Sequence, residues 1–321
     1  MSAYDVAIIG GGPAGLSAAL VLGRCRRRVI LFDHGHPRNY AAVDIHGYLG
    51  HDCIPPAQLR ALGRKECQAY GVEFVDSEVH GVCMQREAPS QFQVKAEGHP
   101  TVVARKLLLA TGVKDKLPDI EGFKDFYGTS AHHCPYCDGW EHRDQHLVAI
   151  GEGKAAIGLA LSLRTWSDRV TACICGEPIT AEDRQRAERN GVDVREGQPV
   201  RMEGRDGRLE RIHFAVGPPL KCDALFFNTE MVQRSRLPCM LGCECDDSGM
   251  IRTKGKQGTG VCGLFLAGDA DGDVQFAIVA AAEGAVAATA INRELQDEDM
   301  GEADPVAADS RPPQAAVCIK P

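Results

Sequence analysis

Aromatic residues are scarce in this sequence, and no long uninterrupted apolar run is present. Phe, Trp and Tyr together make up 6% of the 321 residues. The longest apolar stretch, FAIVAAAEGAVAATAI at 276–291, is interrupted by Glu283 and is too rich in alanine and glycine for a membrane span. The chain opens with MSAYDVAIIGGG, which has no basic segment, so we expect neither a signal peptide nor a membrane partner.

No basic run stands out either, and the formal net charge is −8, so nucleic acid is not an expected partner. Hydrophobic residues reach 44%, enough for a substantial core, and 35 glycines suit an α/β protein whose backbone lies close to a ligand. The 14 cysteines are scattered, which predicts mostly reduced thiols in a cytoplasmic protein. A close pair among them is then catalytic or metal-binding rather than structural.

The segment YDVAIIGGGPAGLSAALVLGRCRRRVILFD, residues 4–33, reads as strand, turn, helix and strand. Gly10, Gly12 and Gly15 form G-x-G-x-x-G, which allows a tight turn, close backbone approach to a pyrophosphate and packing of helix on strand. The helix start offers free N–H groups to phosphate. Asp33 ends the second strand near the spacing expected for a ribose contact, so the segment predicts a dinucleotide site.

A second, weaker copy lies at 146–177. Gly151, Gly153 and Ala156 satisfy G-x-G-x-x-A between a strand and a helical pattern, and the next strand runs into Glu177. Two such motifs predict two bound nucleotides, or one nucleotide and a relic of a second site.

Two further segments fit the first motif. Residues 104–113 form a strand that closes in the sequence ATG, and residues 260–292 form a strand ending in GD before a long alanine-rich helix. Asp269, at the carboxyl end of that strand, faces the crevice where ligands bind in open α/β sheets and could bond a polyol such as the ribityl chain of FAD.

The order of these motifs predicts an α/β protein with two Rossmann-like three-layer nucleotide-binding domains, the second inserted in the first. We expect residues 1–113 and 236–297 to form the first domain and residues 114–235 the second. The acidic and proline-rich residues 298–321 are expected to be a disordered tail, with Cys318 incidental.

The sequence HHCPYCDGWE places Cys134 and Cys137 three residues apart. C-x-x-C pairs near a helix start have a lowered thiol pKa, and a protonated His132, His133 or His142 would lower it further. Zinc is an alternative but needs four ligands, and no second C-x-x-C completes the set. A static disulfide does not suit a reducing compartment. The other cysteines that could have served as ligands are Cys173, Cys175, Cys239, Cys243 and Cys245.

At this point the chain resembles the low-molecular-weight thioredoxin reductases, which are FAD flavoproteins. The resemblance covers residues 4–295 and rests on GGGPAG, the ATG strand, C-x-x-C-D-G before the second glycine motif, and AGDADGDVQFAIVAAAEG. It implies FAD as cofactor and a homodimer. It also implies that Cys137 lies nearer the flavin, that Cys134 exchanges with substrate, and that Asp138 is the acid–base group.

The resemblance further implies that backbone N–H groups of DVQFAIVAAAEG reach the flavin, although the family's Arg-Gln is Gln275-Phe276 here. His46 stands where the reductases have an asparagine, and could be a base or a ring packed on the flavin. No metal site is predicted. The predicted catalytic residues are Cys134, Cys137, Asp138 and His133, and the predicted cofactor-binding residues are Gly10, Gly12, Pro13, Ala14, Gly15, Asp33, His46, Val79, Thr111, Gly112, Gly268, Asp269, Gln275, Phe276 and Ala277.

The second glycine motif departs from a reductase. The family's arginine cluster for the 2′-phosphate of NADPH is missing, and Glu177 stands in its place, where it would repel that phosphate. Arg184 and Arg186 could replace the cluster only if the loop folds back, and Glu152 and Lys154 replace smaller residues. Binding of NADP(H) is therefore doubtful.

Without a nucleotide donor, electrons could run from a dithiol to the flavin. The sequence then predicts a dithiol oxidase that closes a disulfide in a small-molecule dithiol, with O2 as acceptor and H2O2 as product. It resembles the branch that forms disulfides in natural products such as gliotoxin, holomycin and romidepsin. The alternatives are an NAD(P)H-dependent thioredoxin or disulfide reductase, and a redox sensor that keeps FAD without turnover.

Overall fold

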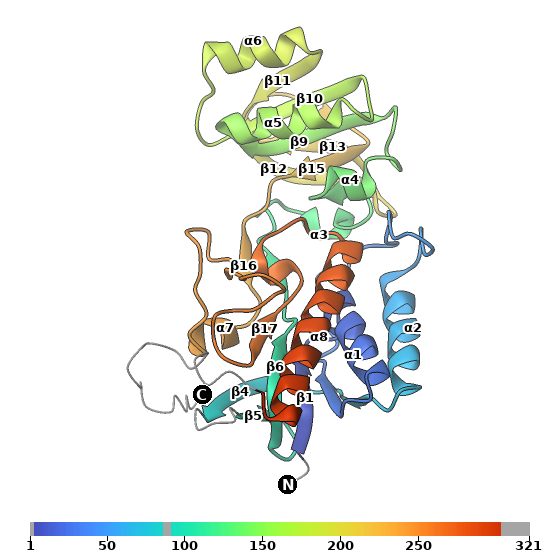
Figure 1. The fold of residues 1–321 in the computed structure, drawn as a ribbon. Coiled ribbons are helices and arrows are strands. Elements are labelled where there is room, and N and C mark those ends of the chain that lie inside the picture. Colours follow the sequence, from blue (N-terminus) through green and yellow to red (C-terminus); the bar gives the residue numbers. More distant parts are fainter. Residues whose placement is uncertain (1–2, 86–90, 303–321) are drawn as a thin grey trace.

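The structure of the chain is a computed structural model that describes residues 3–85 and 91–302 (Figure 1). Most of the predicted tail, with Cys318, lies outside the described residues. The described part contains two large sheets, each covered on both faces, and one ribbon that joins them. The prediction of an α/β fold with two Rossmann-like three-layer units is confirmed.

The first sheet has a parallel core, in the order β3-β2-β1-β6, with β17 on the far edge of β6. An antiparallel hairpin, β4–β5, pairs with the first half of β6. These strands are β1 (Ala3–Ile9), β2 (Val29–Phe32), β3 (Glu73–Val75), β4 (Val79–Gln85), β5 (Gln91–Ala96), β6 (Val102–Leu109) and β17 (Leu264–Leu266).

Three helices cover one face of this sheet: α1 (Pro13–Arg24), α2 (Pro56–Gln68) and α8 (Ala277–Met300). Alternation along β1 divides its side chains, since Val6 and Ile8 pack with these helices while Ala7 and Ile9 pack on the opposite face. The opposite face is covered by the β4–β5 hairpin and by α7 (Leu237–Met240) with the loop after it.

The second sheet is all parallel, in the order β11-β10-β9-β15-β8. Its two faces pack against different layers, one helical and one a three-stranded antiparallel sheet. The elements are β8 (Ala131–His132), β9 (His146–Glu152), β10 (Arg169–Cys175), β11 (Val192–Glu196) and β15 (Ala224–Phe227), with α5 (Gly153–Leu163) and α6 (Ala181–Arg189) on one face and β12 (Pro199–Arg205), β13 (Arg208–Phe214) and β14 (Leu220–Lys221) on the other.

A two-stranded ribbon marks where the chain crosses between the sheets. β7 (Val113–Asp115) leaves the first sheet and pairs antiparallel with the returning β16 (Met231–Gln233). Because both crossings lie side by side, we propose that residues 1–113 and 236–297 form one domain and that residues 114–235 form the inserted domain.

The C-terminal helix corrects one boundary. A tail from residue 298 was expected, but α8 continues to Met300. Arg105 binds Glu298 at 2.7 Å and Asp299 at 2.8 Å, so ion pairs with β6 hold the last turn of the helix.

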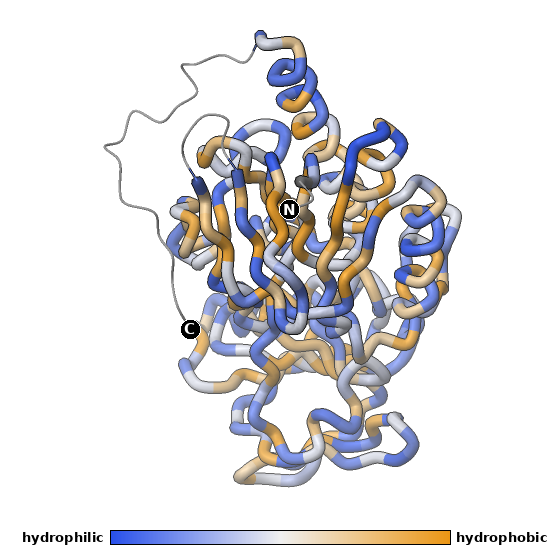
Figure 2. Tube along the Cα trace, turned by 90° about the horizontal axis from the view of Figure 1, so that it is seen from below, coloured by the Kyte–Doolittle hydropathy of each residue, from blue (hydrophilic) through white to orange (hydrophobic). Residues whose placement is uncertain are grey.

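Figure 2 colours the Cα trace by hydropathy, and hydrophobic residues are frequent along the strands of the first sheet. Within the described ranges, no helix is both long and apolar enough to cross a membrane.

Candidate active site

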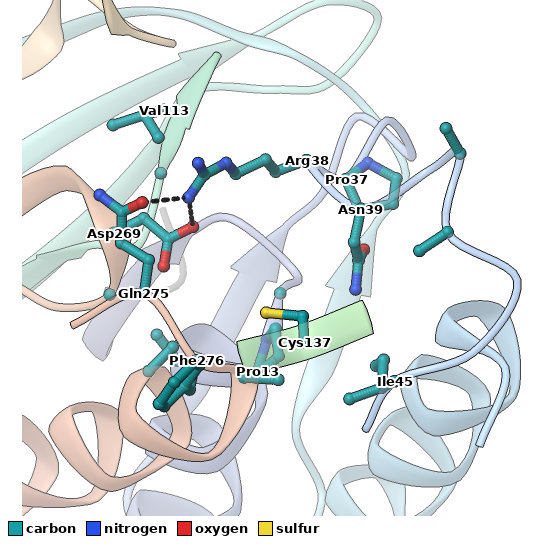
Figure 3. A pocket seen from close by; sticks show the side chains of 18 of the residues that line it. Pro13, Pro37, Arg38, Asn39, Ile45, Val113, Cys137, Asp269, Gln275 and Phe276 are labelled. Carbon is teal, nitrogen blue, oxygen red and sulfur yellow. Dashed lines mark hydrogen bonds and ion pairs between the residues drawn. The ribbon is translucent and has the colours of Figure 1, made fainter. Parts of the chain in front are cut away.

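A deep cleft opens where the carboxyl ends of β1, β6 and β17 meet the segment that follows β8 (Figure 3). It holds about 1420 Å³, including the part open to solvent. Cys137 lies within it, opposite Arg38 and Gln275. The cleft therefore brings the first glycine motif, the GD segment and the C-x-x-C pair together.

The first glycine turn has the backbone that its sequence predicts. Gly10 has a φ of +119°, and a Cβ there would lie 2.0 Å from the carbonyl oxygen of Ala110. A Cβ on Gly12 would meet nothing within 4 Å, because this N-cap of α1 faces the open cleft. Pro13 follows at the first helical position and also lines the cleft. The helix start is thus open to an anionic group.

Gly15 has a packing role instead. It does not line the cleft, and a Cβ on it would lie 1.9 Å from the carbonyl oxygen of Gly10. This glycine lets α1 lie directly against the end of β1, as the motif predicts.

Asp33 directly follows β2 at the wall of the cleft, with 7% of its surface exposed. Its Oδ2 accepts a hydrogen bond from Arg60 at 2.6 Å, and its Oδ1 accepts the N–H of Gly35 at 3.0 Å. Burial raises the pKa of Asp33, but the bonds from Gly35 and Arg60 outweigh it and leave the pKa below its ordinary value. Asp33 is therefore an ionised acceptor whose position is fixed by Arg60, a residue that the sequence did not reveal.

Two polar atoms in the cleft wall are left unpaired among the described residues. Oγ1 of Thr111 and Nε of Arg60 are buried without a hydrogen-bond partner. Buried polar groups are usually paired, so these atoms indicate a polar ligand. FAD fits this arrangement: Asp33 and Arg60 suit its adenosine ribose, the start of α1 its pyrophosphate, and Thr111 and Asp269 its polyol chain.

Arg38 organises the opposite wall and was not predicted. Its Nη1 donates to Asp269 at 2.9 Å and to Gln275 at 2.7 Å (Figure 3). Its Nε and Nη2 donate to the two oxygens of Asp115 at 2.8 and 2.6 Å. Burial alone would raise the pKa of Asp115, yet Arg38 holds that pKa below its ordinary value. Asp269, which the sequence suggested as a hydrogen-bond partner of a polyol, has its Oδ2 bound to Arg38.

The start of α8 contributes its backbone to the cleft. Phe276 is the N-cap and Ala277 the first residue of this helix, and both line the cleft. The Phe276 ring meets Tyr136 of the C-x-x-C segment edge to face at 6.4 Å, and Tyr136 meets Trp166 at 5.5 Å. The Phe276–Tyr136 contact thus joins the start of α8 to the C-x-x-C segment.

Cys134 and Cys137 form a disulfide, with their Cα atoms 5.3 Å apart. Cys134 follows β8 and is the N-cap of α4 (Pro135–Asp138), and its sulfur accepts the backbone N–H of Cys137 at 3.1 Å. Both cysteines line the cleft. An N–H bond to sulfur stabilises a thiolate, so this turn is suited to thiol–disulfide exchange.

A chain of polar side chains leads away from Asp138. Its Oδ1 lies 3.2 Å from Nδ1 of His132, which is 5% exposed. Nε2 of His132 lies 3.0 Å from Nε2 of His142, and Nδ1 of His142 lies 2.9 Å from Oε1 of Gln145. One proton can be shared between the two facing Nε2 atoms, so the chain can move a proton to or from Asp138.

His133 lines the cleft but has different surroundings. Its ring lies 6.4 Å from that of Tyr127 and 6.2 Å from that of Phe227. Burial lowers the pKa of His133, and burial likewise lowers the pKa of His142. Both shifts favour the neutral ring, which disfavours the help that a protonated His133 or His142 would give to the thiols.

His46 reaches the cleft from the loop after β2. Its Nδ1 lies 3.5 Å from Sγ of Cys53 and 3.7 Å from a carboxylate oxygen of Glu141. His46, Asp52 and Cys53 offer ligand atoms within 4.8 Å of one another, and Asp52 also accepts the N–H of Gly47 at 2.8 Å.

Besides Gly15, one other predicted cofactor residue, Val79, does not line the cleft. Val79 starts β4 and packs against the core on the far face of the sheet, because alternation along the strand turns its side chain inward. It does not line the cleft. The remaining predicted cofactor residues that line it are Ala14, Gly112 and Gly268 together with those described above.

The second glycine loop carries two carboxylates. Glu152 is the N-cap of α5 and is exposed. Glu177 lies beside the loop, with its Cβ 3.8 Å and its carbonyl oxygen 3.6 Å from the Cβ position of Gly153. Arg184, one of the two arginines that could have replaced the missing cluster, forms an ion pair with Glu196 instead.

Comparison with known proteins places these features in context. The family model of pyridine nucleotide-disulphide oxidoreductases matches residues 4–284. The chain is 33% identical to thioredoxin reductase tcpT of Claviceps purpurea, covering 83% of this chain and 86% of that protein. It is 28% identical to thioredoxin reductase sirT of Leptosphaeria maculans, covering 93% and 96%. The crystal structure of HlmI superimposes with a TM-score of 0.90 at 37% identity, covering 95% and 96%.

Proposed function

Because the chain belongs to the pyridine nucleotide-disulphide oxidoreductase family, we propose that it works as an FAD-dependent dithiol oxidase. The chain is an FAD-binding, thioredoxin-reductase-like oxidoreductase, and the proposal concerns its direction and substrate. The substrate is a small-molecule dithiol in which the enzyme closes a disulfide, with O2 as acceptor. The resemblance to the natural-product branch supports a biosynthetic precursor, such as that of an antibiotic, as this substrate.

The contrast between the two glycine loops carries the proposal. In the first loop, Gly12 and Pro13 leave the start of α1 open to the cleft, and the C-x-x-C disulfide faces the same space. In the second loop, Glu152 and Glu177 bring negative charge to the place where NADPH would bring its phosphates. Like charges at close range disfavour binding, so a nucleotide donor is disfavoured while the dithiol route is open.

The exchange step uses the predicted catalytic residues. A substrate thiolate attacks Sγ of Cys134, the Cys134–Cys137 bond breaks, and Cys137 leaves as a thiolate. The second substrate thiol then attacks the substrate sulfur of the mixed disulfide and releases Cys134. The backbone N–H of Cys137 stabilises the Cys134 thiolate as it leaves.

The acid–base role is assigned to Asp138. It takes a proton from the substrate thiol, and His132 orients its carboxylate through the 3.2 Å contact. When bound, FAD supplies a two-electron acceptor that restores the disulfide and reduces O2 to H2O2. In the net reaction the substrate loses two electrons and two protons, and O2 becomes H2O2.

An anaerobic reduction experiment tests the proposal. Purified holoprotein is mixed with NADPH, NADH or dithiothreitol while the visible absorbance of the flavin is followed. We expect bleaching by the dithiol and not by either nucleotide, and release of H2O2 when air is admitted. Rapid bleaching by NADPH or NADH would contradict the proposal.

An NADH-dependent disulfide reductase is the second candidate. Glu177 lies at the second glycine loop, where a carboxylate can accept from a ribose 2′-hydroxyl. Rapid bleaching by NADH alone would favour it.

We also propose that the protein is a cytoplasmic homodimer. The compartment is supported by cysteine usage, since the sequence has 14 cysteines and the described residues hold one disulfide, Cys134–Cys137, which suits a reducing compartment. The homodimer is supported by the resemblance to the thioredoxin reductases.

A further inference from the structure

A second pair of cysteines lies in the segment that follows α7. Sγ of Cys239 and Sγ of Cys245 are 3.5 Å apart and share a hydrogen bond. Both residues are exposed, whereas Cys243 between them is buried. These three cysteines do not line the cleft, so they are not part of the redox pair described above.

The local backbone brings the two sulfurs together. Cys239 lies in the short helix α7, and Gly242 follows with a φ of +86°, which reverses the chain. Cys245 then forms an antiparallel bridge with Ile251. A disulfide needs a sulfur separation of roughly 2 Å, so small rotations of two exposed side chains would close the bond.

We propose that Cys239 and Cys245 are a second dithiol–disulfide site, oxidised by hydrogen peroxide. The sulfur of Cys239 attacks one peroxide oxygen, which breaks the O–O bond, leaves a sulfenic acid and releases water. The sulfur of Cys245 then attacks the sulfenic sulfur and expels a second water. Two thiols thus lose two electrons and two protons, and one peroxide becomes two waters.

The chemistry of the three thiols differs in a way that supports this pairing. Burial raises the pKa of Cys243 to about 11, so this thiol stays protonated and shielded from solvent. Thiolate character and exposure control oxidation. The pKa of Cys245 is raised as well, by burial and by the neighbouring Cys239, so exposure and the 3.5 Å sulfur separation, rather than acidity, favour reaction of Cys239 with Cys245 over Cys243.

The Cys239–Cys245 pair is connected to the cofactor cleft through Ile251, the bridge partner of Cys245. The N–H of Ile251 donates to the carbonyl of Ala270 at 3.0 Å, and the side chain of Gln233 donates to the same carbonyl at 2.7 Å. Ala270 follows Asp269, which lines the cleft. A cross-link between Cys239 and Cys245 would therefore restrict the segment that supports Asp269.

Peptide mapping tests the site directly, since trypsin releases residues 237–252 with all three cysteines. The holoprotein is treated with H2O2, unfolded, alkylated with iodoacetamide and digested without reduction. We expect a peptide in which only Cys243 is alkylated. Its mass should be lower by two hydrogen atoms than that of the same singly alkylated peptide with two free thiols. A disulfide that includes Cys243, over-oxidation of either exposed thiol, or three alkylated cysteines would overturn the proposal.

The thermal unfolding midpoint gives a second readout. We expect peroxide to raise it by a few degrees in the wild type, because a cross-link restricts the unfolded chain. The Cys239→Ser/Cys245→Ser variant should show no rise, and an equal rise in this variant, or none in the wild type, would overturn the proposed cross-link. Because the peroxide is added from outside, these results do not depend on the proposed oxidase activity.

Discussion

Arg38 and Asp115 form a two-point ion pair, with Nη2–Oδ1 at 2.6 Å and Nε–Oδ2 at 2.8 Å. Arg38 belongs to the loop after β2, and Asp115 ends β7, the first strand of the ribbon between the two sheets. The Asp115 side chain is 3% exposed and that of Arg38 is 14% exposed. The pair therefore joins the cleft wall to the crossing point of the chain.

Removal of Arg38 should be costly. Arg38→Met leaves Asp115 and Asp269 without their cation, and loss of one partner of a buried pair destabilises by about 3–5 kcal/mol. Denaturant unfolding of the holoprotein measures this loss. The control is Arg205→Met, whose pair with Glu210 is exposed and should contribute less than about 1 kcal/mol. Similar losses in both variants would contradict the prediction.

Asp138 and His132 should have separable effects on turnover. Asp138→Asn removes the acid–base group and should lower kcat for dithiol oxidation about 100-fold or more. His132→Asn should lower kcat less and should also shift the pH profile, since His132 positions the carboxylate. His146→Asn is the control, because His146 bonds Thr171 on a neighbouring strand instead. An unshifted profile in the His132 variant would leave that residue with a packing role only.

Glu283 should make stability depend on pH. Its Oε2 accepts the N–H of Gly268 at 2.6 Å, and burial raises its pKa from 4.5 to about 7. A raised pKa in the folded state gives stabilisation that is complete below the ordinary pKa and is lost as pH rises through about 7. The expected loss is of the order of 3 kcal/mol.

Comparison with Glu283→Gln isolates this effect, because the amide still accepts from Gly268 but does not titrate. Unfolding midpoints measured from about pH 5 to about pH 8 should fall more steeply in the wild type than in the variant. Parallel curves would show that Glu283 does not titrate in this range.

Reversal of charge at the second glycine loop should restore some use of NADPH. Glu177→Arg replaces a repelling carboxylate by a phosphate-binding cation, and we expect NADPH to bleach the flavin at least about tenfold faster. The matched control is Glu188→Arg on α6, which makes the same charge change at an exposed position. Equal rates in both variants would mean that Glu177 does not limit nucleotide binding.

The close contact between α1 and α8 should not tolerate a methyl group added at Gly284. A Cβ on Gly284 would lie 2.0 Å from the carbonyl oxygen of Ala14, so Gly284→Ala should push the helices apart and cost about 1–3 kcal/mol. It should also weaken flavin retention, since α1 starts at the cleft. Gly158→Ala in α5 meets nothing within 4 Å and should be neutral or slightly stabilising. A stable, flavin-replete Gly284→Ala protein would contradict the prediction.

Short sequence patterns predicted those parts of the site whose structure depends on residues that are neighbours in the sequence. The turn at Gly10 and Gly12, the acid at Asp33 and the C-x-x-C pair each depend on neighbours within a few residues, so the sequence shows them. The order of the glycine motifs and of the strands beside them predicted the two sheets for the same reason.

Contacts between residues that are far apart in the sequence could not be predicted from local patterns. Arg38 bonds Asp269, 231 residues away, and the segment DHGHPRNY does not reveal this partner. The last turn of α8 depends on Arg105 of β6 in the same way, so composition alone predicted a tail from residue 298. For Val79, the side of the strand that faces the core depends on pairing with Ala96.

The β7–β16 ribbon sets Val113 opposite Gln233 in register. The first part of the chain could therefore be closed by a short turn at this point, and the excised segment has neighbouring ends that a linker could join. On the proposed division of the chain, this one strand pair is therefore the place where the inserted segment could be removed or exchanged.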